Sequence, residues 1–431
     1  MKALYPTETE RPTRRVFLAG VRLRNRPAWE FEDSMEELAQ LTVALGAKVV
    51  GRGAQKLDRP CAATFLGRGK AEEFARQCCE LEADTVVFDD ELTPAQTRNL
   101  EEIFQRKILD RTALILDIFA RRAQTKEGKL QVELARLEHL LPRLAGYWSH
   151  LSRQRGGIGV RGGEGEKQLE MDRRRVLQQI DRLKKQLEEV RRRRRVQREG
   201  RLRRQWPLAS LVGYTNAGKS TLFNALTGAR SAEMDQLFAT LDPMTRRLRL
   251  PTNRNVLLSD TVGFIRKLPT QLVEAFKATL EEVVHADLLL HVVDATHPQA
   301  EDQIAAVESV LEEIGALEKP ILLIFNKIDR LHNGERLNRR LAQYPAAVAV
   351  SAKTGEGFDA LMNELSSRLR PARRLIELEL PHSAGPIHAR LREVGQIIEA
   401  NYDGPTARLK ARIPPHCRAE FAPYITADLE A

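Results

Sequence analysis

Residues 208–228, LASLVGYTNAGKSTLFNALTG, decide the fold that we expect for this 431-residue chain. The apolar run 208–212 predicts a buried strand, and the segment from Lys219 predicts a helix that ends at Gly228. Between them, residues 213–220 match the pattern G-x-x-x-x-G-K-[ST] in full. Glycines in such a loop let backbone N–H groups point at a phosphate, while the lysine and the serine can hold phosphate oxygens and Mg²⁺. The stretch therefore predicts a P-loop domain of the α/β class.

Three further motifs follow in the order that a guanine-nucleotide site needs. The D-T-V-G motif at residues 260–263 ends an apolar strand, so its aspartate can support a Mg²⁺ shell and its glycine N–H can meet a γ-phosphate. The N-K-I-D motif ends at Asp329, and we expect this carboxylate to be buried and to accept N1–H and the N2 amine of guanine. Ser351-Ala352-Lys353 matches the loop that closes over the base. Any one motif could be a polar turn at a strand end, but the four in this order predict a GTPase.

The chain outside these motifs predicts three other domains. Short apolar runs alternate with amphipathic stretches over the first ~110 residues, with strands expected at 16–21, 48–50 and 84–88 and a helix at 35–45. Two apolar seams with steps of 4, 3, 4 and 3 residues, at 130–144 and 176–190, predict an antiparallel helical hairpin, joined by a glycine-rich connector from Gly146 to Gly165. We expect an N-terminal α/β domain at 1–113, the hairpin at 114–205, the G domain at 206–370 and a small α/β domain at 371–431.

Positive charge is concentrated on the second helix of the predicted hairpin. The whole chain has a formal charge of +10, and residues 173–204 hold 15 Lys or Arg against 4 Asp or Glu. Five consecutive arginines, 191–195, lie in this segment. A solvated helix face is the ordinary explanation for such a run. Arginine suits phosphate geometry, so we favour contact with RNA.

Composition also excludes several classes of protein. The four cysteines show neither zinc-ligand spacing nor a disulfide framework, and no apolar run is long enough for a signal peptide or a membrane span. We expect a monomeric cytoplasmic protein without an integral membrane segment, and peripheral association with a membrane stays open.

The motifs resemble those of the HflX family of ribosome-associated, translation-factor-related GTPases. The resemblance rests on F-A-T-L-D-P at 238–243, DDELTPAQTRNLE at 89–101, DRTALILDIFARRAQTKEGKLQVELARLEHLLPRL at 110–144 and GGIGVRGGEGEKQLEMDRRR at 156–175. It covers about residues 15–370 and matches the last sixty loosely. One departure is visible: the loop after Arg161 is one residue longer than the family's R-G-P-G-E-T-Q-L-E and lacks its proline.

The motifs and the resemblance together imply a set of site residues. Lys219, Thr240 and Gly263 are the expected catalytic residues, and Ser220 and Thr240 the expected Mg²⁺ ligands. By resemblance, Asn216 could hold a K⁺ ion beside the phosphates; the alternative is that it only braces the loop. The expected nucleotide contacts are Gly213, Tyr214, Thr215, Asn216, Ala217, Gly218, Lys219, Ser220, Thr221, Phe238, Ala239, Thr240, Leu241, Asp242, Asp260, Thr261, Val262, Gly263, Asn326, Lys327, Ile328, Asp329, Ser351, Ala352 and Lys353.

The resemblance implies a switch protein that binds the large ribosomal subunit and its RNA and splits or rescues stalled ribosomes. Phe264 stands where many GTPases carry the glutamine that orients the attacking water, so we expect slow intrinsic turnover that the ribosome stimulates. The alternatives are a GTP-dependent assembly or RNA-binding factor without splitting activity, and a module in which GTP is only a structural ligand. Turnover that rises with added ribosomes would exclude the structural ligand.

Overall fold

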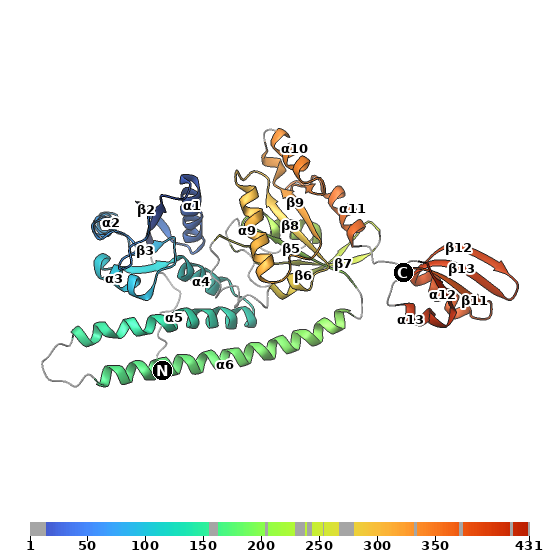
Figure 1. Ribbon diagram of the computed structural model, residues 1–431, viewed down its shortest axis with the longest axis horizontal. Coiled ribbons are helices and arrows are strands. Elements are labelled where there is room, and N and C mark those ends of the chain that lie inside the picture. The colour runs from blue at the N-terminus through green and yellow to red at the C-terminus, as the bar shows by residue number, and fades with distance from the viewer. Residues whose placement is uncertain are drawn as a thin grey trace. The chain divides into compact units, whose positions relative to one another are not determined.

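The structure is a computed structural model of the chain, drawn in Figure 1. It describes residues 14–154, 163–202, 206–228, 238, 244–252, 254–266, 280–331, 334–369, 374–413 and 417–429. The chain folds into two compact units. Unit 1 comprises Met1–Arg249 with Asn253–Leu361, and unit 2 comprises Leu250–Thr252 with Met362–Ala431.

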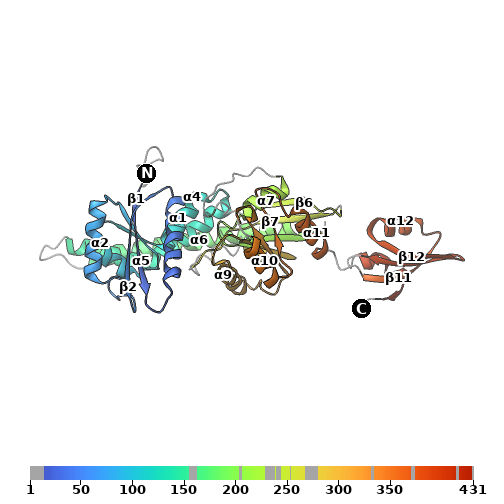
Figure 2. The same cartoon turned by 90° about the horizontal axis from the view of Figure 1, so that it is seen from above.

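The N-terminal part of unit 1 is a parallel four-stranded sheet in the order β2-β1-β3-β4. Helices α1 and α4 cover one face and α2 and α3 cover the other, so that α1 and α2 lie on opposite sides of β1 in Figure 2. The predicted helix at 35–45 begins earlier, and the predicted strand at 48–50 is longer. The elements are β1 (Arg15–Leu23), α1 (Ala28–Ala44), β2 (Lys48–Leu57), α2 (Arg68–Glu80), β3 (Thr85–Phe88), α3 (Pro94–Phe104), β4 (Lys107–Asp110) and α4 (Arg111–Arg122).

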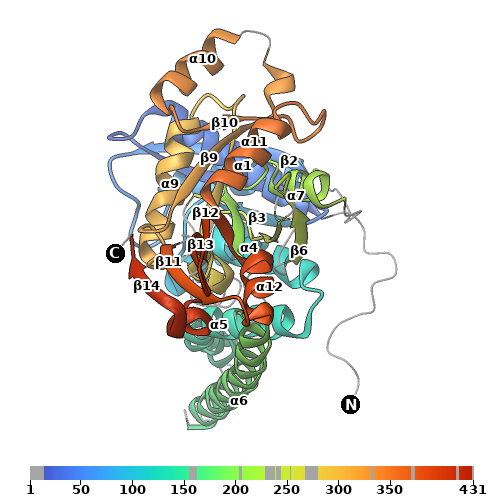
Figure 3. The same ribbon diagram turned by 90° about the vertical axis from the view of Figure 1, so that its right-hand side faces the viewer.

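The predicted hairpin is formed by α5 (Lys126–Gln154) and α6 (Gly163–Leu202). They lie side by side in Figures 1 and 3, and α5 lies between α6 and the N-terminal sheet in Figure 1. Members of both predicted seams meet in one buried cluster, which contains Leu134, Ile180, Leu183 and Leu187. The expectation for the connector was wrong at its ends: Gly146 lies in α5, and Gly163 and Gly165 lie in α6. A helix tolerates a glycine at a cost of about 1 kcal/mol, which strong helix formers around it offset.

The second sheet of unit 1 carries the predicted P-loop. Its order is β10-β9-β8-β5-β7-β6, parallel except for the edge strand β6, which is antiparallel to β7. The strands are β5 (Leu208–Gly213), β6 (Met244–Arg249), β7 (Asn255–Asp260), β8 (Leu288–Asp294), β9 (Ile321–Asn326) and β10 (Val348–Ala349). The helices of this part of the chain include α7 (Lys219–Thr227), α9 (Ala300–Glu313), η1 (Ile328–Arg330), α10 (Gly334–Gln343) and α11 (Phe358–Arg368), the last of which continues into unit 2. Residues 280–284 are helical as well.

A hydrophobic cluster, here called the shared core, joins the N-terminal domain, α5 and the G domain. It includes Leu38 of α1, Val132 of α5 and Phe264 after β7. The rings of Phe119 and Phe238 meet edge to face in it, with their centroids 4.6 Å apart. The N-terminal domain and the G domain are therefore joined through apolar contacts.

Unit 2 is a ferredoxin-like β-α-β-β-α-β arrangement with an antiparallel sheet in the order β12-β13-β11-β14. One face of the sheet forms an apolar core with Leu391 and Phe421 of its helices. On the other face, acidic residues of β11 lie beside basic residues of β13. The elements are β11 (Arg374–Pro381), α12 (Gly385–Val394), β12 (Gln396–Asp403), β13 (Thr406–Ile413), α13 (Arg418–Phe421), η3 (Ala422–Tyr424) and β14 (Ile425–Asp428). Among the described residues of the whole chain, no helix is both long and apolar enough to cross a membrane.

A buried ion cluster lies at the same junction as the shared core. The guanidinium of Arg111, which is 2% exposed, donates to Glu37 at 2.5 Å and to Asp89 at 2.8 Å. Asp89 also accepts from the Ser34 hydroxyl at 2.7 Å. These four residues are called the Arg111 cluster below.

We predict that Arg111→Met destabilises the protein by about 3–5 kcal/mol, because two buried carboxylates lose the cation between them. The free energy of unfolding from urea titration measures the effect. Arg136→Met is the matched control, since Arg136 pairs with Asp117 at 3.0 Å but is half exposed; it should cost no more than about 1 kcal/mol. Equal losses in the two variants would contradict the assignment of Arg111 as the central cation.

Candidate nucleotide-binding site

The P-loop follows β5 and leads into α7, as the sequence predicts. Gly213 has φ +146°, and a Cβ there would lie 2.2 Å from the carbonyl oxygen of Val292. Gly218 has φ +92°, and a Cβ there would lie 2.3 Å from Nδ2 of Asn326. Both motif glycines are therefore required by backbone geometry and by close neighbours on β8 and β9.

Lys219 places a buried ammonium inside this loop. Its Nζ donates to the carbonyl oxygens of Gly213 at 3.0 Å and Tyr214 at 2.8 Å. Burial, opposed by nearby Asp260 and assisted by nearby Lys327, lowers the pKa of Lys219 to about 8. A neighbouring anion stabilises the charged form of a buried lysine whose pKa is low. Lys219 is therefore suited to bind a phosphate group.

The hydroxyl of Ser220 donates to Oδ2 of Asp260 at 2.7 Å. Ser220 lies in the first turn of α7 and Asp260 ends β7, so the parallel sheet brings the two predicted motifs together at its carboxyl edge. Hydroxyl and carboxylate oxygens are the ligands that Mg²⁺ prefers. The donor set therefore fits the metal that the sequence predicts.

The predicted base-binding motifs also meet. Asn326 donates from Nδ2 to the carbonyl oxygen of Ala217 at 2.9 Å, and its Oδ1 accepts from the N–H of Ala352 at 2.9 Å. The hydroxyl of Ser351 donates to Asp329 at 2.6 Å. Asn326 thereby ties the P-loop to the S-A-K loop.

Two features of the predicted base-binding region were not expected from the sequence. Asp329 is exposed, not buried as expected, because it lies on the short turn η1 at the rim of the sheet. Asp294 at the end of β8 binds Nζ of Lys327 at 2.7 Å, and sequence reasoning did not single it out. Its position at the end of a central parallel strand could have indicated that Asp294 lies at the site.

The two predicted switch regions are described in part. Residues 239–242, including Thr240, lie outside the described residues, while Phe238 is buried. Gly263 packs closely on the P-loop, since a Cβ there would lie 2.9 Å from Nζ of Lys219. Phe264 is 3% exposed and its ring belongs to the shared core. Residues 263–266 are called the switch II segment below.

Asn216 is exposed at the tip of the P-loop, with φ +61°. Its side chain makes no hydrogen bond with any residue that the structure describes, so the alternative role, in which this side chain braces the loop, is not observed among those residues.

We predict that GDP binding takes up close to one proton at pH 9. The pKa of Lys219 is about 8 in the free protein, so the amine is mostly neutral at pH 9, and an ionised phosphate restores the ammonium. Affinity should fall by up to about tenfold per pH unit above pH 8. Isothermal titration calorimetry in buffers of different ionisation enthalpy counts the protons. Binding without proton uptake at pH 9 would refute the phosphate contact.

Comparisons with known proteins agree on one family. Three family models match in succession: "GTP-binding GTPase N-terminal" at residues 32–120, "GTP-binding GTPase Middle Region" at 122–201 and "50S ribosome-binding GTPase" at 209–327. GTPase HflX of Caldanaerobacter subterraneus is 47% identical over 384 residues, which cover 89% of this chain and 88% of the relative. GTPase HflX of Escherichia coli is 47% identical over 388 residues, 89% of this chain and 90% of the relative.

Among solved structures, a GTP-binding protein from the archaeon Sulfolobus solfataricus in complex with GDP is 27% identical, with a TM-score of 0.43. The alignment covers 82% of this chain and 98% of that chain. The curated relatives are similar over almost their whole length, and the N-terminal, middle and G-domain models all match in order. The chain therefore belongs to the HflX family of GTPases.

Proposed function

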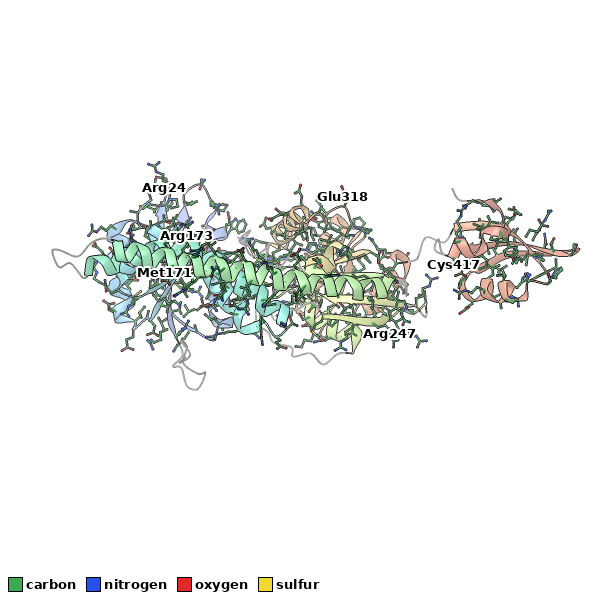
Figure 4. The ribbon with its side chains drawn as sticks, turned by 90° about the horizontal axis from the view of Figure 1, so that it is seen from below. Arg24, Met171, Arg173, Arg247, Glu318 and Cys417 are labelled. Atoms are coloured by element: carbon green, nitrogen blue, oxygen red, sulfur yellow. The ribbon has the colours of Figure 1, made fainter. Side chains whose placement is uncertain are left out.

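We propose that this GTPase binds the large ribosomal subunit through ribosomal RNA and splits or rescues stalled ribosomes. The observation that carries the proposal is the charge of α6. The basic residues Arg173, Arg174, Arg182, Lys185 and Arg192 are exposed, and none of them forms an ion pair with another described residue. Figure 4 views the molecule from a side on which Arg173 of α6 is seen.

A separate set of α6 residues, Ile180, Leu183 and Leu187, is apolar and buried against α5. From residue 173 to residue 192 the helix is about 30 Å long at 1.5 Å per residue, a length suited to several phosphates of an RNA backbone. Support for the ribosome as the source of that RNA comes from the family, one of whose models is described as "50S ribosome-binding GTPase". A ribosomal partner would place the protein in the cytoplasm, as a monomer on its target.

The site residues then take the following roles. Lys219 binds the β- and γ-phosphate oxygens, and the P-loop N–H groups surround the β-phosphate. Ser220 and Thr240 hold Mg²⁺, which would neutralise charge on the β and γ oxygens. Gly263 donates its N–H to the γ-phosphate. Asp329 binds the guanine edge, and residues 351–353 cover the base.

Hydrolysis in this proposal depends on groups other than the residue after Gly263. The ring of Phe264 is buried in the shared core and offers no hydrogen bond to a water. The attacking water is then oriented by backbone groups, by another part of the chain or by the bound ribosome. Slow turnover without a partner follows from this arrangement.

Co-sedimentation with separated ribosomal subunits tests the proposal. We predict that the protein binds the large subunit more tightly with a non-hydrolysable GTP analogue than with GDP, and that Arg173→Glu with Arg174→Glu and Arg182→Glu weakens binding at least tenfold and lowers its salt dependence. Arg408→Glu with Arg412→Glu and Lys410→Glu, which makes the same charge change in unit 2, is the control.

Equal binding in both nucleotide states would exclude a GTP-controlled switch. Intact ribosomes, followed by light scattering, separate the alternatives. Dissociation that requires the GTP analogue supports splitting, whereas subunit binding without dissociation identifies an assembly or RNA-binding factor.

We also predict that GTP turnover is several-fold faster in KCl than in NaCl at equal ionic strength. A K⁺ ion at Asn216 would neutralise charge developing between the β and γ oxygens, as an arginine finger does. The exposed amide of Asn216, which makes no hydrogen bond with a described residue, supports this role. The preference should disappear in Asn216→Ala. Equal rates in the two salts for the unchanged protein would exclude the cation.

A further inference from the structure

The switch II segment is bound directly to the P-loop. The N–H of Thr215 donates to the carbonyl oxygen of Phe264 at 2.7 Å, and the N–H of Phe264 donates to the carbonyl oxygen of Gly213 at 3.1 Å. These bonds make a parallel bridge between Tyr214 and Phe264. Two neighbouring backbones are therefore joined where the phosphates of a nucleotide are expected.

A third bond comes from the side chain of Tyr214. Its hydroxyl oxygen accepts the N–H of Arg266 at 2.8 Å and donates its own proton to Oε2 of Glu37 at 2.6 Å. A phenol has one proton to donate. Because that proton is committed to Glu37, a lone pair of the oxygen is directed at Arg266. Helix α1 of the N-terminal domain thus orients the hydroxyl that holds switch II.

The same helix holds the side chain of Arg266. The guanidinium lies 3.2 Å from Asp33 and over the ring of Trp29, 5.8 Å from its centroid. Residue 266 is therefore bound at its backbone through Tyr214 and at its side chain through α1. The Arg111 cluster fixes the other oxygen of Glu37, so the acceptor for Tyr214 is itself rigid.

This placement brings Gly263 against the phosphate-binding lysine. A Cβ on Gly263 would meet Cγ2 of Thr215 at 2.8 Å and Nζ of Lys219 at 2.9 Å. A γ-phosphate must contact both Nζ of Lys219 and the N–H of Gly263, so it has to enter beside a glycine that has no room for one further carbon atom. A β-phosphate, which the P-loop N–H groups hold, makes no such demand on Gly263.

We propose that Tyr214 is a specificity-determining residue that favours GDP over GTP, because its hydroxyl holds the switch II segment on the P-loop in a position that admits a diphosphate but must open for a triphosphate. GTP breaks the Tyr214–Arg266 hydrogen bond when it binds, and GDP leaves it intact. The hydroxyl acts through the backbone of residues 263–266, so Tyr214 is a positioning residue and not a catalytic one.

Tyr214→Phe tests the proposal, because it removes the hydroxyl and keeps the ring. Affinities for GDP and for a non-hydrolysable GTP analogue are measured with fluorescent nucleotides. One hydrogen bond is worth about 0.5–1.5 kcal/mol net, so the preference for GDP should fall by about 2- to 12-fold, through tighter binding of the analogue at nearly constant GDP affinity. A general loss of structure would weaken both nucleotides alike.

Tyr344→Phe is the matched control. This tyrosine also lies in the G domain, and its hydroxyl makes no hydrogen bond with another described residue. Its nucleotide preference should stay that of the unchanged protein. If Tyr214→Phe leaves Glu37 without a donor and fails to bind GDP, the double variant Tyr214→Phe with Glu37→Gln replaces it, since a neutral amide costs less to bury than an unpaired carboxylate. An unchanged ratio of the two affinities in a variant that binds GDP overturns the proposal.

Discussion

The buried guanidinium of Arg111 is the constraint on which the arrangement of unit 1 depends. It lies between Glu37 and Asp89, and burial raises the pKa of Glu37 while Arg111 opposes that shift. A carboxylate at this depth needs its partners, because an uncompensated buried charge costs several kcal/mol. Tyr214 of the P-loop supplies the remaining hydrogen bond to Glu37. The electrostatic demands of the N-terminal domain are therefore met only when the G domain is packed against it.

Apolar packing also stabilises the interface between the N-terminal domain and the G domain. The shared core includes residues of α1, α4, α5 and the G domain, and the contact between Phe119 and Phe238 lies within it. Apolar contacts supply attraction without direction, whereas the hydrogen bonds of the Arg111 cluster have one satisfactory geometry. Together they give the two sheets one way to pack, which keeps the P-loop and switch II next to α1.

Local motifs made most of the nucleotide site predictable. The loop at 213–220 lies between its predicted strand and helix, and D-T-V-G and N-K-I-D follow β7 and β9, two parallel strands whose carboxyl ends lie at the same edge of the sheet. Motifs of this kind carry their own backbone requirements, as the positive φ of Gly218 shows. The exposure of Asp329 was not foreseen, because burial depends on where a turn lies relative to the sheet rim.

Contacts between domains could not be predicted in the same way. Tyr214 and Glu37 are separated by 177 positions, and no periodicity or motif links them. A tyrosine inside the P-loop motif was the only local indication that a hydrogen bond forms here, and the sequence does not show which residue accepts it. The connector of the hairpin was predicted to be too long. Its glycine content indicated a loop at positions where Gly146 and Gly163 in fact extend the helices.

The burial of Phe264 connects the chemistry of the site with this packing. A residue that cannot orient water contributes instead by anchoring the switch II backbone, since its ring lies in the shared core together with Val132 of α5. Side chains in a well-packed interior change between discrete packing arrangements more readily than they deform continuously. Movement of switch II away from the P-loop must therefore be accommodated by neighbours on the hairpin and on α1. The hairpin that bears the basic surface and the switch II segment thus share one core, which gives an event at either a physical route to the other.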